Sequence, residues 1–172
     1  MRWSSVLAKA NRKDKGLLYF AVTREYDTPS SHIVLATSRD GIHLQEEKIL
    51  VQGVPDQRNQ NPNLFRDPCS GRFYLTFYRG NDRDHFEIIS KSADSILDLD
   101  NAPEKMLLES DATVAAPTLL YVKKTKNAEG KRRGTYYLAT EIYPHRYTGN
   151  PRGRVAGQGL LRRQSRWRLS AG

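Results

Sequence analysis

The chain has 172 residues, of which 38% are hydrophobic and 27% are charged, and its formal net charge is +9 at pH 7. This length and composition predict an ordinary buried core and a single domain. Because Cys69 is the single cysteine, the chain cannot form an internal disulfide. No apolar region of the secretory type follows Met1, and no apolar run approaches the roughly 20 residues of a membrane helix.

The sequence repeats itself at a spacing of about 55 residues, and each repeat consists of short apolar runs separated by turn-forming residues. Three pairs of segments match: Leu18–Thr23 with Phe73–Tyr78, Ile33–Ile42 with Glu87–Ile96 and, less closely, Asn61–Phe65 with Ala116–Leu120. A strand repeat of this length predicts an all-β fold, the β-propeller, in which each repeat is a four-stranded antiparallel blade.

The first repeat, residues 3–57, predicts four strands, with an Asp-Gly hairpin turn at residues 40–41 between the third and the fourth. These strands are expected at Val6–Ala10, Leu17–Thr23, His32–Ser38 and His43–Val51. The second repeat, residues 58–111, predicts strands at Pro62–Phe65, Phe73–Arg79, Phe86–Ser92 and Lys105–Leu108. Between its last two strands, residues 94–101 fit either a loop or a helical turn.

The third repeat, residues 112–150, contains a charged insertion at 123–133 and a second strand at 135–142. Closed propellers typically need four to eight blades, so about three blades predict an incomplete ring. An open arc leaves a sheet edge uncovered. We therefore expect either part of a larger propeller, which we favour, or a ring completed by self-association.

Residues 151–172 differ from the rest of the chain because they contain six arginines and no acidic residue. This basic tail also loses the strand alternation. We expect it to be disordered; a basic arm for nucleic acid or anionic lipid is the alternative that we favour less.

Blades that open with an X-Pro-X-apolar-aromatic strand, such as Asn61–Phe65, and continue with an aromatic-Tyr-Leu strand resemble the five-bladed propeller glycosidases. This superfamily includes arabinanases, β-xylosidases and invertases. The segment 36–43, Ala-Thr-Ser-Arg-Asp-Gly-Ile-His, is similar to a turn that recurs in those proteins. The resemblance covers about residues 5–145 and implies that the protein has a site that binds a glycan.

Cleavage of a glycosidic bond requires two carboxyl groups on opposite sides of the bond. In this superfamily an aspartate opens one inner strand in an Asp-Pro motif, and a glutamate opens another in a Glu-x-Pro motif. Here Asn61 occupies the aspartate position and Ala115 the glutamate position, and no carboxylate stands near Ser4 and Ser5, where a third is expected. An amide cannot ionise, so this alignment argues against hydrolysis by the usual pair.

A second alignment uses residues 65–68, Phe-Arg-Asp-Pro, which resemble the Arg-Asp-Pro motif of invertase-type enzymes. It makes Asp67 the residue that grips sugar hydroxyls, although an Asp-Pro turn after the inner strand explains the same residue and is our preferred interpretation. The candidate catalytic residues are Asp67 and Glu141. Glu141 and His145 are chosen because they stand where a second strand ends and can reach a channel mouth, although ordinary loop residues explain the pair as well. The candidate substrate-binding residues are Asn61, Arg66, Arg79 and His145.

The sequence contains no phosphate-binding glycine loop, no metal-ligand spacing and no nucleophile elbow, so we expect neither a cofactor nor a metal. The favoured interpretation is a glycoside hydrolase-like propeller that acts on or binds a carbohydrate, with catalysis impaired at Asn61 and Ala115. The alternatives are a non-catalytic carbohydrate-binding propeller and a basic interaction module that acts through residues 151–172.

Overall fold

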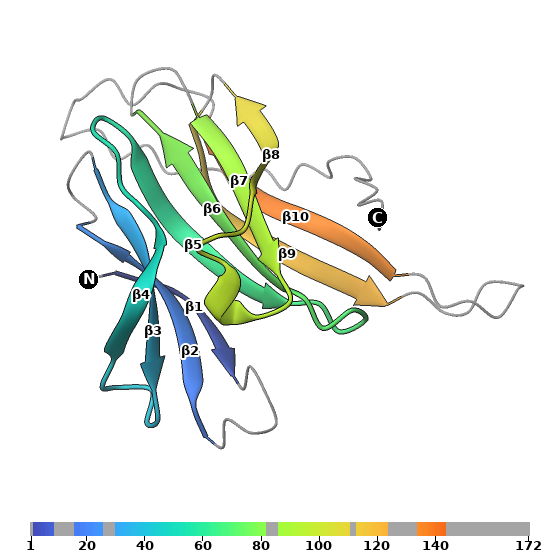
Figure 1. The fold of residues 1–172 in the computed structure, drawn as a ribbon. Helices are drawn as coiled ribbons and strands as arrows, with labels where there is room; N and C mark the ends of the chain where they lie inside the picture. Colours follow the sequence, from blue (N-terminus) through green and yellow to red (C-terminus); the bar gives the residue numbers. More distant parts are fainter. Residues whose placement is uncertain are drawn as a thin grey trace, which may run out of the picture.

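The computed structural model describes residues 2–8, 16–25, 30–81, 86–110, 113–123 and 134–143. These residues form ten strands and one short 3-10 helix, arranged as three antiparallel sheets that follow one another along the chain (Figure 1). The basic tail and His145 lie outside the described residues. Since the 3-10 helix has three residues, no helix in the described part of the chain could span a membrane.

Blade 1 consists of four strands in sequential order, β1 (Arg2–Ala8), β2 (Leu18–Arg24), β3 (His32–Ser38) and β4 (Gln45–Val51). Blade 2 repeats this order with β5 (Arg58–Arg66), β6 (Phe73–Gly80), β7 (Phe86–Ala93) and β8 (Glu104–Ser110). The third sheet pairs β9 (Thr113–Lys123) with β10 (Gly134–Tyr143). Sequential antiparallel four-stranded sheets confirm the predicted fold class, an incomplete β-propeller.

Three strands begin two or more residues away from their predicted starts. Strand β1 begins at Arg2 because it pairs with β2 along its length, from Arg2 opposite Thr23 to Ala8 opposite Leu18. Strand β4 begins at residue 45 because Asp40 organises the preceding turn by accepting from the main-chain N–H groups of residues 42 and 43. Strand β5 begins at residue 58, before the predicted Pro62, because a bulge accommodates the proline.

The helical turn considered for residues 94–101 is present as the 3-10 helix Ile96–Asp98. Ser95 caps it, since the Ser95 hydroxyl accepts a hydrogen bond from the main-chain N–H of Leu97 at 3.2 Å. Ile96 is buried and anchors the turn in the core, which fixes the connection between β7 and β8.

The first strands of blade 2 and of the third sheet share a bulge immediately before a proline. Asn61 has φ 50° and Ala116 has φ 48°, which is the left-handed region that non-glycine residues seldom adopt. The pairing register shifts there in both sheets, between Gln60 and Asn63 in one and opposite residues 139–141 in the other. Proline has no N–H to donate to the hydrogen-bond ladder. The bulge therefore lets each proline stay inside a strand without leaving an acceptor of the neighbouring strand unpaired.

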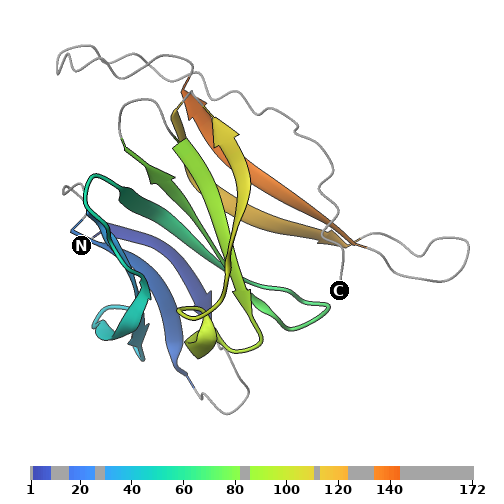
Figure 2. The same ribbon diagram turned by 45° about the horizontal axis from the view of Figure 1, so that its top comes forward.

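The sheets pack face to face, and blade 2 lies between blade 1 and the third sheet (Figures 1 and 2). The main core joins residues of blade 1, such as Ile33 and Leu35, to residues of blade 2, such as Leu75 and Phe77, and all four are fully buried. A smaller cluster around Ile88 and Val114 joins blade 2 to the third sheet. Each blade therefore depends on its neighbour for burial of its apolar face.

Candidate functional site

The turn between β5 and β6 is built around Asp67. Its carboxylate accepts hydrogen bonds from the main-chain N–H groups of Cys69 at 2.9 Å and Ser70 at 3.2 Å, and from the Ser70 hydroxyl at 2.5 Å. The Asp67 main chain also bonds across the turn to Gly71 and Arg72, each at 2.8 Å. Asp67 is 4% exposed, so the turn holds an ionisable group in a fixed and largely buried position.

Four aromatic side chains gather beside this turn where blade 2 meets the third sheet; we call Phe65, Tyr74, Tyr121 and Tyr136 the tyrosine cluster. Ring centroids lie 6.2 Å apart for Phe65 and Tyr74, 6.5 Å for Phe65 and Tyr136, and 5.1 Å for Tyr121 and Tyr136. All four side chains are half-buried. Phe65 and Tyr74 lie directly opposite each other on β5 and β6, as do Tyr121 and Tyr136 on β9 and β10.

Asp67 and Tyr136 link the turn to the third sheet, because the two side chains are hydrogen-bonded. Burial raises the pKa of Asp67, but the hydrogen bonds from Ser70, Cys69 and Tyr136 outweigh burial, and the net pKa falls below its ordinary 3.8. The pKa of Tyr136 is raised well above its ordinary 10.0. Burial is the largest cause, followed by the hydrogen bond to Asp67 and the charge of Asp67. At neutral pH the site therefore holds an ionised carboxylate and a protonated phenol that donates to it.

The hydrogen-bond inventory of Asp67 limits what this carboxylate can do. An ionised carboxylate has about four acceptor sites. The turn donors from Cys69 and Ser70, together with Tyr136, account for four hydrogen bonds to it. The arrangement suits a carboxylate that organises an Asp-Pro turn, as the sequence favoured, and that in addition contacts Tyr136.

Arg79 lies at the far end of β6 and forms part of a polar cluster between blades 1 and 2. Its guanidinium binds Glu104 in bidentate geometry, at 2.6 and 2.8 Å, and its Nε donates to Asn59 Oδ1 at 3.0 Å. The hydrogen bond from Arg79 lowers the pKa of Glu104 more than burial raises it. The guanidinium also lies 5.2 Å from the centroid of the Phe77 ring. These contacts lie within blade 2, and Asn59 continues them to blade 1 through its hydrogen bonds with Ser31.

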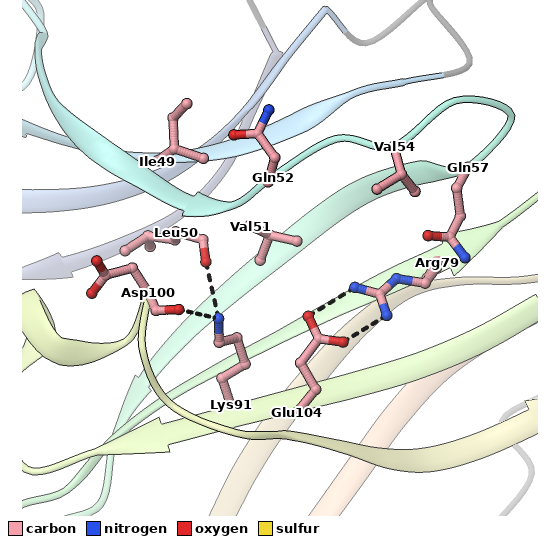
Figure 3. A pocket seen from close by; sticks show the side chains of 10 residues that line it. All are labelled: Ile49, Leu50, Val51, Gln52, Val54, Gln57, Arg79, Lys91, Asp100 and Glu104. Atoms are coloured by element: carbon pink, nitrogen blue, oxygen red, sulfur yellow. Dashed lines mark hydrogen bonds and ion pairs between the residues drawn. The ribbon is translucent and has the colours of Figure 1, made fainter.

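A cavity of about 450 Å³ opens beside this polar cluster, between β4 and the strands of blade 2 (Figure 3). Lys91 reaches into it and is 5% exposed; its ammonium donates to the carbonyls of Leu50 at 3.1 Å and Asp100 at 2.7 Å. Burial is the largest influence on the pKa of Lys91 and lowers it. The Asp100 carboxylate in turn pairs with Lys48 at 2.8 Å. The cavity wall is thus a set of contacts that cross from one blade to the next.

The remaining predicted site residues lie outside the tyrosine cluster, although Arg66 borders it, because its Nε donates to the Gly71 carbonyl of the Asp67 turn at 3.3 Å. Arg66 is exposed and stacks on Phe73, 5.3 Å from the ring centroid. Asn61 occupies the bulge of β5, and Glu141 is exposed and lies opposite Ala115 on β9. Glu141 is five positions beyond Tyr136 on β10, which corresponds to roughly 17 Å of strand.

Sequence reasoning overlooked Asn59, Lys91 and Glu104. Each forms its contacts with residues far away in the chain, so no local spacing marks them. For Lys91 the sequence does offer one indication, since a charged residue within a partly apolar strand must find a polar partner when it is buried. Among the described residues, no group of three or more His, Cys, Asp or Glu side chains is arranged to hold a metal ion.

No protein-family model matches the chain, and no curated protein matches it. Among solved structures it is similar to a GH43 β-1,3-galactosidase, with 11% identity, a TM-score of 0.47 and coverage of 86% of this chain and 33% of that chain. It is also similar to a structure from Bifidobacterium bifidum named as an exo-β-1,3-galactanase, with 12% identity, a TM-score of 0.44 and coverage of 83% of this chain and 48% of that chain.

The chain therefore spans about a third and about half of the lengths of these two proteins. Both are named as glycosidases, the class that the sequence resembles. Because both TM-scores lie below 0.5, the propeller assignment rests on the strand order and pairing shown in Figure 1.

Proposed function

We propose that this chain is a carbohydrate-binding propeller that holds a glycan on the tyrosine cluster without cleaving it. The observation that carries the proposal is the cluster itself: four half-buried aromatic rings from two neighbouring sheets beside a fixed, ionised carboxylate. Aromatic faces accept the C–H faces of sugar rings, and tyrosine adds a hydroxyl for hydrogen bonding.

Rigidity of the cluster supports this role. Tyr136 is fixed by its hydrogen bond to Asp67, and the Cys69 thiol donates to the Tyr121 hydroxyl at 2.9 Å. Rings held in place in the free protein lose little side-chain entropy on binding. A sugar ring that stacks on Tyr136 or Tyr74 would therefore meet a surface that is already arranged.

The absence of cleavage follows from the carboxylates available. Asp67 is ionised and its acceptor sites are occupied, so at neutral pH it can neither protonate a leaving group nor attack readily as a nucleophile. Asn61 and Ala115 lack ionisable groups, and Glu141 stands at the other end of β10 from Tyr136. These positions therefore favour binding over cleavage by the two-carboxylate mechanism.

The test is isothermal titration calorimetry with arabino-, xylo-, fructo-, manno- and β-1,3-galacto-oligosaccharides, followed by chromatography of each mixture for shortened products. We expect at least one oligosaccharide to bind and to be recovered intact. Tyr136→Ala should weaken its affinity at least tenfold. Tyr136→Phe, which keeps the ring, should weaken it less.

Ile42→Ala is the control for these variants, because Ile42 is an exposed apolar residue, 72% accessible, in the β3–β4 turn of blade 1. Its affinity should equal that of the unmodified chain. Equal affinity of Tyr136→Ala and Ile42→Ala for the bound sugar would contradict the assignment of the cluster. Release of shortened products by the unmodified chain would contradict the non-catalytic role.

A further inference from the structure

The cavity between blades 1 and 2 contains a buried cation. Lys91 lies on β7, is 5% exposed and lines this cavity. Its ammonium has three N–H donors, and two of them bind the main-chain carbonyls of Leu50 and Asp100. Among the residues that the structure describes, no salt bridge joins this ammonium to a carboxylate. Buried charges in proteins are usually paired, so one donor and the charge of Lys91 remain available to a ligand.

The two carboxylates that line the cavity already have cations of their own. Glu104 lies directly opposite Lys91 across β7 and β8, yet its oxygens bind Arg79 at 2.6 and 2.8 Å. Asp100 pairs with Lys48 at 2.8 Å. Three cations thus accompany two carboxylates, and Lys91 is the cation without a bound anion. Burial is the largest influence on its pKa and lowers it, as expected of a cation in that position.

The blade 1 side of the cavity is largely apolar, and its rim is held in place (Figure 3). Ile49 and Val54 line the cavity and are 40% and 43% exposed. The rim loop is anchored at Gly53, whose main-chain N–H donates to His32 Nδ1 at 2.9 Å. Gly53 also packs so closely that a Cβ there would lie 2.1 Å from the Ser30 carbonyl oxygen. The cavity is therefore formed before any ligand arrives, which lowers the entropic cost of binding.

We propose that this cavity binds a small carboxylate ligand with a compact aliphatic group. The carboxylate accepts the third N–H of Lys91, and the aliphatic group packs against Ile49 and Val54. Charge-assisted hydrogen bonds of this kind are stronger than neutral ones. The volume of about 450 Å³ lies within the range of about 300–1,000 Å³ that is typical of ligand sites. Because the tyrosine cluster lies between blade 2 and the third sheet, this site is separate from the proposed glycan site.

Titration of the unmodified chain with isobutyrate, followed by the NMR shifts of its main-chain amides, tests the proposal. Isobutyramide has the same shape without the charge, and inorganic phosphate has the charge without the aliphatic group. We expect saturable shifts at residues 50–54 and 91 with isobutyrate, and at least tenfold weaker binding of the other two compounds. Isobutyrate should also raise the urea unfolding midpoint, because it binds the folded chain.

Lys91→Met removes the ammonium and should weaken isobutyrate binding at least tenfold. Lys105→Met is the matched control, since Lys105 is an exposed lysine on β8 that does not line the cavity, and it should bind as the unmodified chain does. Equal affinity of the two variants would overturn the proposal. Shifts that do not saturate, or equally tight binding of isobutyramide or phosphate, would overturn it as well. The comparison of the three compounds uses the unmodified chain, so it does not depend on the folding of either variant.

Discussion

Asn59 is the residue whose loss should weaken the joint between blades 1 and 2 most. It is fully buried on β5, and its side-chain amide Nδ2 donates to the Ser31 carbonyl at 3.2 Å and, more weakly, to the Gln52 carbonyl at 3.5 Å. Its Oδ1 accepts from Arg79 Nε at 3.0 Å. Asn59→Ala removes these bonds and leaves buried polar groups of both blades without their partner.

The hydrogen bonds that Asn59→Ala removes set the size of the loss in unfolding free energy. A neutral hydrogen bond contributes about 1 kcal/mol and one to a charged group about 1.5–3 kcal/mol, so the bonds to Ser31 and Arg79 together account for about 3 kcal/mol of unfolding free energy. Domains are stable by about 5–15 kcal/mol in total. With a urea m-value of about 2 kcal/mol/M, the unfolding midpoint of Asn59→Ala should fall by roughly 1.5 M.

The assay is urea unfolding followed by circular dichroism, with Asn63→Ala as the control. Asn63 lies on the same strand, but it is half-buried and its Oδ1 accepts one bond, from the Leu119 main-chain N–H at 3.2 Å. We expect Asn63→Ala to lose about 1 kcal/mol. If both variants lost the same free energy, or if Asn59→Ala lost less than about 1 kcal/mol, the role of Asn59 in joining the blades would be refuted.

Three further predictions concern titration and backbone strain. The hydrogen bond and charge of Asp40 raise the pKa of His43 above its ordinary 6.5, so Asp40→Asn should return it toward that value in an NMR titration; an unchanged pKa contradicts this. Because burial lowers the pKa of Lys91, the unfolded chain binds more protons at alkaline pH, and unfolding free energy should rise as pH increases through the window below 10.5. Lys91→Met should lack that rise in urea unfolding measured from pH 7 to 10. Ala116→Gly should stabilise the chain by up to about 1 kcal/mol, because the left-handed conformation costs alanine about 1–2 kcal/mol and glycine loses only part of that in entropy; a lower urea midpoint would contradict it.

The strand order was predictable because blade strands are local and repeat along the chain. The alternation around Phe73–Tyr78 and Leu18–Thr23 depends only on neighbouring residues, and both segments form second strands of blades as expected. The contacts of Arg79 were not predictable, because Glu104 lies 25 positions away and meets it only after β6, β7 and β8 assemble. Sequence reasoning thus identified Arg79 as a notable polar residue but could not supply its partner.

The tyrosine cluster was partly predictable. Tyr74 and Tyr136 stand out as aromatic residues at strand spacing, and Asp67 stands out before a proline. Their meeting depends on the angle between blade 2 and the third sheet, which is set by packing around Ile88 and Val114. That packing involves side chains 26 positions apart, and no motif in the sequence records it.

In each inner strand, the bulge before Pro62 or Pro117 assigns two roles to different residues. One role is packing in the core, and the other is the chemical character of the strand. The leucines that follow, Leu64 and Leu119, are 5% and 7% exposed and have the same identity in both sheets, because packing dictates them. The residues at the bulge, Asn61 and Ala116, lie outside the regular ladder and differ in chemistry. During evolution, substitutions at the bulge can thus change the chemical character of an inner strand while the blade beneath it keeps its shape.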